Sequence, residues 1–329
     1  MNLLASLRYL AALSEHRHFG RAAAACHITQ PALSNALRAL EAEFGVVIVR
    51  RGRSFAGLTP EGETVLASAH RMLHEHERLQ QQLRSEAGHP RGHLRMAAVP
   101  TAMPLLTRFA ARLRARHPGI VPTVLSMSSV ELEAGLDALA LDLALGYTER
   151  MDARGKSQVA RLQAWPQTVE HYFLLQRRKA PGRGKGKGKG DDGLRLGPPI
   201  GWADAAVLPL VLLTPEMHNR AIVDAAFRAA GAQAVQPAIE TNSVLTLALA
   251  VQAGEVCAIL PGAMVDTVRR HADLEALPLV APEVRTPLGF MAPAAVRPSR
   301  ALEAALALLQ DETWRAEAEA HSGTLRADA

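Results

Sequence analysis

Residues 19–52 read FGRAAAACHITQPALSNALRALEAEFGVVIVRRG, and they contain two helical patterns separated by a turn at residues 27–29. The first pattern, GRAAAAC, predicts a short helix, and the second, QPALSNALRALEAEF, predicts a longer one. Thr29 suits the N-cap of the longer helix, Pro31 fits its first turn, and Gly45 is a typical residue for its end. An earlier helix is expected from Asn2 to Ser14, because apolar residues recur there on one helical face.

The segment after Gly45 reads VVIVRRGRSFAGLT. Two extended runs, Val46–Val49 and Phe55–Leu58, flank Arg-Gly-Arg and predict a small hairpin, or wing. Pro60 then opens a helical stretch that reaches about Ala87 and spans roughly 40 Å. A long one-sided helix outside a compact domain usually pairs with a copy of itself, so we expect this helix to form a dimer seam. Its apolar spacing is set by Val65, Ala69, Met72, His76, Leu79 and Leu83.

Residues 88–92, GHPRG, are expected to form a hinge, and strands and helices alternate beyond it. This alternation predicts an α/β fold with parallel sheets in two lobes. The expected elements of the first part are strands 94–99, 121–126 and 141–146 with helices 103–116 and 131–139. Those of the second part are strands 208–213 and 256–260 with helices 219–230 and 244–253, followed by a strand at 288–292 and one helix at 299–318.

The net charge of +5 suggests nucleic-acid binding, but it comes from one segment. Residues 177–190, RRKAPGRGKGKGKG, hold seven Lys or Arg and no acid, so the rest of the chain carries −2. A Gly/Lys run of this kind is expected to be a solvated excursion. Any case for DNA binding must therefore rest on local pattern.

Several classes of protein fit the sequence poorly. We find neither a membrane-spanning pattern nor a signal pattern, and we expect a cytoplasmic protein without membrane contact. Cys26 and Cys257 lie far apart, so a disulfide framework is not expected. His70 and His74 have a spacing found in metal sites, but no Cys or acid joins them in the sequence pattern, and we expect no metal. No motif of a nucleophilic, metal-dependent or phosphate-binding enzyme is present.

The residues FGRAAAACHITQPALSNALRALEAEFGVVIVRRG, followed by LTPEGE, resemble the start of LysR-type transcription regulators in order and spacing. PLLTRFAARLRARHPGI, LALDLALG and AVQAGEVCAILP extend the resemblance over almost the whole chain. It implies a multidomain α+β and α/β protein with an N-terminal winged helix-turn-helix over residues 1–59. A linker helix and hinge would follow over 60–89, and a two-lobed α/β effector domain of the periplasmic-binding-protein type over 90–329. Lobe I would comprise about 90–164 and 266–329, and lobe II about 165–265.

The resemblance implies a sequence-specific DNA-binding regulator that is not an enzyme and is switched by a small effector. It implies a homodimer or homotetramer on double-stranded DNA, with RNA polymerase as a candidate partner and no cofactor. The chain departs from the family pattern at Gly20, where Ser or Thr is usual, in an extra Arg near the wing tip, and in the basic Gly/Lys segment.

The longer helix has an apolar face, with Leu33, Leu37, Leu40 and Phe44, that should pack on the first two helices. Gln and Asn on its other face can pair with adenine, and Arg can pair with guanine, so this face fits the major groove. The candidate base-reading residues are Thr29, Gln30, Pro31, Ser34, Asn35 and Arg38. Arg50, Arg51 and Arg53 on the wing are expected to meet phosphates. A merely solvated helix face and a charged hairpin tip are the alternatives.

Effector residues are expected at strand ends and helix starts between the lobes, where free N–H groups attract anions. Few aromatic residues lie nearby, which favours a carboxylate or other small anion over a large aromatic molecule. The candidates are Pro100, Thr101, Ser128, Ser129, Tyr147, Thr214, Asn219, Thr241, Asn242 and Ser243. Plain helix caps are the alternative at each position. For the whole chain, the alternative is a small-molecule-binding protein without DNA regulation, which the first 90 residues disfavour.

Overall fold

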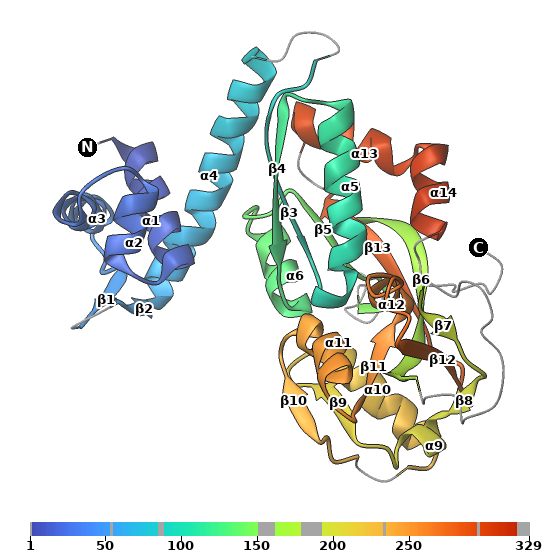
Figure 1. The fold of residues 1–329 in the computed structure, drawn as a ribbon. Coiled ribbons are helices and arrows are strands. Elements are labelled where there is room, and N and C mark those ends of the chain that lie inside the picture. The colour runs from blue at the N-terminus through green and yellow to red at the C-terminus, as the bar shows by residue number, and fades with distance from the viewer. Residues whose placement is uncertain are drawn as a thin grey trace.

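The fold is described from a computed structural model of the chain. The structure describes residues 2–52, 55–84, 89–150, 162–178, 193–232, 235–294 and 297–320. Arg53 and most of the basic Gly/Lys segment lie outside the described residues. A head, a long helix and two lobes follow one another along the chain (Figure 1).

The head packs three helices and a two-stranded hairpin around one apolar core. Its elements are α1 Leu3–His16, α2 Phe19–Ala25, α3 Gln30–Phe44, β1 Val49–Arg51 and β2 Phe55–Leu58. The α3 boundaries agree with the sequence expectation: the Thr29 hydroxyl accepts from the Ala32 N–H, and Gly45 ends the helix at φ 67. Such caps satisfy backbone groups that the helix leaves free.

Two expectations for the head are wrong. The first wing strand begins at Val49 rather than Val46, because the Glu41 carboxylate accepts from the Ile48 and Val49 N–H groups at 3.0 and 3.1 Å. Phe44, expected on the buried face of α3, is 41% exposed. It is the last residue of the helix, and the chain turns away through Gly45 directly after it.

The long helix α4, Pro60–Arg84, is joined tightly to the head at its start. The Thr59 hydroxyl accepts from the Gly62 N–H at 2.9 Å. A Cβ on Gly62 would lie 2.2 Å from the Ile48 carbonyl oxygen, so only glycine fits. Val65 and Ala69 pack into the head core, which corrects their assignment to the dimer seam. The later seam residues Met72, Leu79 and Leu83 are exposed.

Lobe I contains a mixed sheet rather than the expected parallel one. Strands β3 Gly92–Ala98, β4 Ile120–Ser126 and β5 Leu143–Tyr147 are parallel, whereas β13 Arg285–Pro293 runs antiparallel to β5. The core lies between this sheet and helices α5 Met103–Arg116, α6 Ser129–Asp137, α13 Arg300–Leu309 and α14 Glu312–Ala320. The single C-terminal helix expected from the sequence is two helices, because the Asp311 carboxylate caps a new start by accepting from the Thr313 and Trp314 N–H groups.

Lobe II has apolar clusters on both faces of its sheet. Its strands are β7 Arg195–Leu196, β8 Ile200–Gly201, β9 Leu210–Leu213, β10 Ile239–Thr241, β11 Cys257–Pro261 and β12 Leu274–Val280. Its helices are α9 Trp202–Ala205, α10 His218–Ala229, α11 Val244–Ala253 and α12 Gly262–Asp266.

One long strand, β6 Leu162–Arg177, connects the lobes and was not expected from the sequence. Its first part pairs with β13 up to His171, and its second part pairs with β11 from Tyr172 onward. Strand β12 pairs with this second part, so lobe II extends beyond the expected limit at residue 265. In Figure 1, β6 and β13 run from the upper lobe toward the lower one.

None of the helices in the described part of the chain is long and apolar enough to span a membrane.

Candidate functional site

The exposed face of α3 presents polar side chains in one row. Gln30, Asn35 and Arg38 are exposed, and Ser34 is half-buried. The Arg38 guanidinium donates to the Asn35 side-chain oxygen at 3.1 Å, so these two groups satisfy each other in the free protein. Both can form paired hydrogen bonds with a base edge once that contact is exchanged. Thr29 holds the start of the helix as its cap, and Pro31 is exposed beside it.

The wing lies at the lower end of the head, next to the start of α4 (Figure 1), and its first strand begins where the Glu41 side chain of α3 accepts from the Ile48 and Val49 N–H groups. Arg50 is exposed on β1, while the side chain of Arg51 and the whole of Arg53 lie outside what the structure describes. The rings of Phe19 on α2 and Phe55 on β2 meet edge to face, with centroids 6.3 Å apart, and fix the hairpin on the helices. Residues 1–59 carry seven Arg, no Lys and three Glu, so the head is locally basic although the chain outside the Gly/Lys segment is not.

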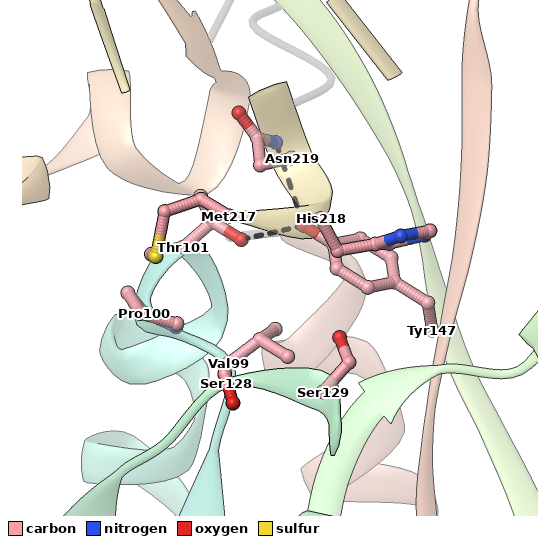
Figure 2. A pocket seen from close by; sticks show the side chains of 9 residues that line it. All are labelled: Val99, Pro100, Thr101, Ser128, Ser129, Tyr147, Met217, His218 and Asn219. Carbon is pink, nitrogen blue, oxygen red and sulfur yellow. Dashed lines mark hydrogen bonds between the residues drawn. The ribbon is translucent and has the colours of Figure 1, made fainter. Parts of the chain in front are cut away.

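A second candidate site is a small pocket between the lobes, shown in Figure 2. It brings together six of the expected effector residues: Pro100, Thr101, Ser128, Ser129, Tyr147 and Asn219. Val99, Met217 and His218 complete the lining and were not expected from the sequence. The cavity volume is about 10 Å³, on a scale where one water needs roughly 10–15 Å³. A larger ligand therefore requires the lobes to separate.

Two helices, one from each lobe, begin at this pocket. Ser128 and Ser129 lie at the start of α6 in lobe I, and Met217, His218 and Asn219 lie at the start of α10 in lobe II. Ser128 closes a capping box with Glu131, whereas the N-cap residue of α10, Met217, offers no side-chain hydrogen bond. Free N–H groups at a helix start favour a negative charge, so two such starts facing one pocket suit an anion.

Hydroxyl and amide groups form a network across the lobe boundary at the back of the pocket. The Thr101 and Tyr147 hydroxyls lie 2.9 Å apart, and the Asn219 amide donates to Tyr147 at 3.4 Å and to Tyr172 at 3.0 Å (Figure 2 shows the first two contacts). Burial raises the pKa of Tyr147, and the nearby Glu170 raises it further, so Tyr147 is a neutral hydrogen-bonding group. The Ser129 hydroxyl lines the pocket, is buried, and has no hydrogen-bond partner among the described residues.

Charged groups lie at one side of the pocket. Arg150 donates to the buried Glu133 carboxylate at 2.8 Å, and its guanidinium approaches the His218 Nδ1 at 3.4 Å. The His218 ring packs against the Tyr147 ring, with centroids 4.9 Å apart and the ring planes tilted by 57°. Burial, followed by the charge of Arg150, lowers the pKa of His218. His218 is therefore a neutral imidazole beside a cation at neutral pH, and neither group opposes an incoming anion.

Four expected effector residues do not line the pocket. Thr214 follows β9, and its N–H donates to the Thr241 carbonyl at 2.9 Å. The Thr241 hydroxyl accepts from the Ser243 N–H at 3.1 Å, and the Ser243 hydroxyl caps α11 by accepting from Thr246. Asn242 is exposed. The sequence pointed to the starts of both α10, through Asn219, and α11. The helix that reaches the pocket is α10, because the loop after β9 places Met217–Asn219 there.

A larger cavity, about 510 Å³, lies between α4 and the edge of lobe I. It includes Glu77, Gln81, Arg91 and His93. No expected effector residue lines it, and it is bordered by the hinge. The interlobe pocket, though smaller, is the one where two helix starts converge with the Ser129 hydroxyl, which has no partner within the described part of the chain.

Comparisons with protein families agree with both parts of this architecture. Residues 4–63 match the model of the bacterial regulatory helix-turn-helix protein, lysR family. Residues 87–183 and 190–314 match the LysR substrate binding domain. The two models together cover most of the chain.

Several curated proteins are similar to this chain. The probable HTH-type transcriptional regulator LrrA of Synechococcus elongatus is 30% identical over 78% of this chain and 80% of its own length. The SDS degradation transcriptional activation protein of a Pseudomonas species is 32% identical over 51% of this chain, and OxyR of Escherichia coli is 34% identical over 41%. The chain spans about half the length of these last two proteins, 56% and 45%.

Solved structures share the fold. A full-length OxyR variant from Pseudomonas aeruginosa matches with a TM-score of 0.63 at 24% identity, covering 92% of this chain and 95% of that one. CbnR, a LysR family transcriptional regulator, matches with a TM-score of 0.62 at 21% identity, covering 93% and 98%. With a helix-turn-helix head, a long helix and a two-lobed substrate-binding domain that match in sequence and arrangement, the chain belongs to the LysR family of DNA-binding transcription regulators.

Proposed function

We propose that the chain reads a specific DNA sequence through α3 and is switched by a small anionic effector, such as a carboxylate, bound between the lobes. The observation that carries the effector part of the proposal is that two helices, α6 from lobe I and α10 from lobe II, begin at one pocket. The buried Ser129 hydroxyl, unpartnered among the residues that the structure describes, lines the same pocket. A ligand held by both lobes favours one arrangement of the lobes over another, by as much as its affinity for the two differs.

The DNA half rests on the exposed polar row of α3 and the local positive charge of the head. Gln30, Asn35 and Arg38 would contact base edges, and Arg50 with the other wing arginines would contact phosphates. The chain would act as a homodimer or homotetramer joined through the exposed apolar residues of α4. RNA polymerase is the candidate partner at the promoter.

Selection of binding sites from random duplex DNA by the full-length chain tests this proposal. We expect enrichment of one inverted repeat, because a two-fold symmetric dimer reads two half-sites. Effector action is then tested by measuring how small carboxylates change the affinity for that repeat. If bound DNA stays random in sequence and its binding is lost steeply with salt, the head binds only phosphates.

A further inference from the structure

Glu170 is a fully buried glutamate with no hydrogen-bond partner among the described residues. It lies on β6, one residue before the last pairing of this strand with lobe I, and its register partner on β13 is Thr286. Its exposed fraction is 0%, and neither carboxylate oxygen is hydrogen-bonded within the described part of the chain. Glutamate is almost never fully buried without a partner, so this group requires an explanation.

The surroundings of Glu170 connect it to the interlobe pocket. Residues two apart on a strand face the same side, so Glu170 lies on the side of Tyr172, which the Asn219 amide contacts. When Glu170 is ionised, its charge raises the pKa of both Tyr147 and Tyr172, whose hydroxyls belong to the network behind the pocket. Burial alone raises the pKa of Glu170 to about 8.

Glu170 does not line the interlobe pocket, so a ligand can meet its carboxylate only if the lobes separate. The Asn219–Tyr147 hydrogen bond joins lobe II to lobe I at the back of the pocket. The pocket holds no more than about one water while the lobes are closed, so a ligand must displace contacts of this kind. Strand β6 passes through this boundary, and Glu170 lies where its pairing changes from one lobe to the other.

We propose that Glu170 is the specificity-determining group of the interlobe site and that the effector carries a protonated amino group that pairs with it. The inference rests on the proposed function and narrows it. The anionic end of the effector faces the starts of α6 and α10, and the amino group faces Glu170. The ligand class is therefore a small amino acid or a similar zwitterion rather than a simple carboxylate.

An amino group suits this place because a buried carboxylate is stabilised only by a close, hydrogen-bonding cation or donor. A protonated Glu170 that meets an ammonium group gives up its proton to solvent and forms a carboxylate–ammonium pair. Binding therefore releases up to one proton per site near neutral pH, which a merely structural Glu170 would not do.

The test is calorimetry on the full-length wild type, Glu170→Gln and Glu170→Asp, with exposed Glu255→Gln as the matched control. The probes are three pairs that differ in the amino group: glycine and acetate, alanine and propionate, and aspartate and succinate. We expect at least one of the amino acids to bind wild type about tenfold or more tightly than the carboxylate that lacks its amino group. Glu170→Gln should weaken that binding by about ten- to a hundred-fold, Glu170→Asp by less, and Glu255→Gln not at all. Repeating the titration in buffers of different ionisation enthalpy should show proton release in wild type but not in Glu170→Gln.

The inference is wrong if no amino probe binds wild type, if each carboxylate binds as tightly as its amino partner, or if Glu170→Gln binds amino probes as wild type does. If the simple carboxylates bind and change the affinity for DNA while the amino acids do not bind, the proposed function is supported and the proposed role of Glu170 is wrong. Should the DNA selection fail while amino probes bind through Glu170, the DNA half of the proposed function falls and this site remains.

Discussion

The Nδ1 atom of His74 lies 3.4 Å from Oδ1 of Asp142, and both side chains are buried. This contact joins α4 to lobe I. The other carboxylate oxygen of Asp142 accepts from the Arg95 N–H at 2.7 Å, so the acid is held from two sides. Further along α4, the Gln81 amide donates to the His93 carbonyl at 3.1 Å. The helix that leads to the DNA-binding head is thus fixed to lobe I, which supplies six of the nine residues that line the pocket.

Acid should destabilise the interface between α4 and lobe I through protonation of His70, which lies one helical turn before His74. Burial, followed by the charge of Arg95, lowers the pKa of His70 to about 4 from an ordinary 6.5. The pKa of His70 is lower in the folded chain than in the unfolded chain. The stability that depends on neutral His70 is therefore fully present above pH 6.5 and is lost as the pH falls from 6.5 toward 4. His74 and Asp142 also lie at this interface. We expect the free energy of unfolding to fall by less than about 1.4 kcal/mol per pH unit in this window, since His70 is only partly buried and solvent screens its charge.

Urea denaturation of wild type and His70→Gln between pH 7 and pH 4.5 measures the effect. The variant should lose less stability over this range, while exposed His271→Gln should behave as wild type. If the free energy of unfolding falls equally with pH in wild type and in His70→Gln, His70 is not the group that causes the loss of stability.

Arg38→Ala should weaken binding to the selected DNA by about 1–3 kcal/mol and relax the preference at one base position. Arg38 is exposed on α3 and its guanidinium donates to Asn35 on the same helix, so the fold should remain intact. Fluorescence anisotropy with matched and mismatched duplexes measures both effects. The control is Arg228→Ala, an exposed arginine of α10 in lobe II. An unchanged preference in Arg38→Ala would remove this residue from the reading face.

Leu79→Asp should weaken self-association of the full-length chain. Leu79 is 50% exposed in the single chain and lies in line with Met72 and Leu83 on α4. If a second α4 covers this stripe, the new carboxylate would be buried without a partner, at a cost of several kcal/mol. Sedimentation velocity should show a shift toward monomer. Val207→Asp, at a highly exposed apolar residue of lobe II, is the control, and equal oligomers in both variants would place the seam elsewhere.

Thr101→Val should weaken effector binding while leaving DNA binding without effector unchanged. Valine keeps the shape but removes the hydroxyl that lies 2.9 Å from the Tyr147 hydroxyl, at a cost of about 1 kcal/mol. Thr107→Val on α5, outside the pocket lining, is the control. Calorimetry with whichever probe binds wild type is the measurement. If Thr101→Val binds the probe as tightly as wild type does, the Thr101 hydroxyl takes no part in effector binding.

The head and the starts of the pocket elements could be predicted from the sequence because their signals are local. Thr29, Pro31 and Gly45 bound α3 through contacts within a few residues, and the polar face of that helix follows from its periodicity. Pro100, Thr101, Ser128, Ser129 and Tyr147 were found because they follow strands, and strand ends in α/β folds meet at one edge.

Only the tertiary structure decided which of these residues meet and which remain apart. The sequence alone did not distinguish α10 from α11 as the second helix at the pocket, because both follow strands and have polar residues near their starts. Val65 and Ala69 fit a dimer seam by spacing, yet the head covers them. Glu170 carries no local signal: it lies in a strand whose two halves pair with segments more than 80 residues away, around positions 258–261 and 285–293. Burial of its carboxylate depends on those distant pairings, and no pattern of neighbouring residues encodes them.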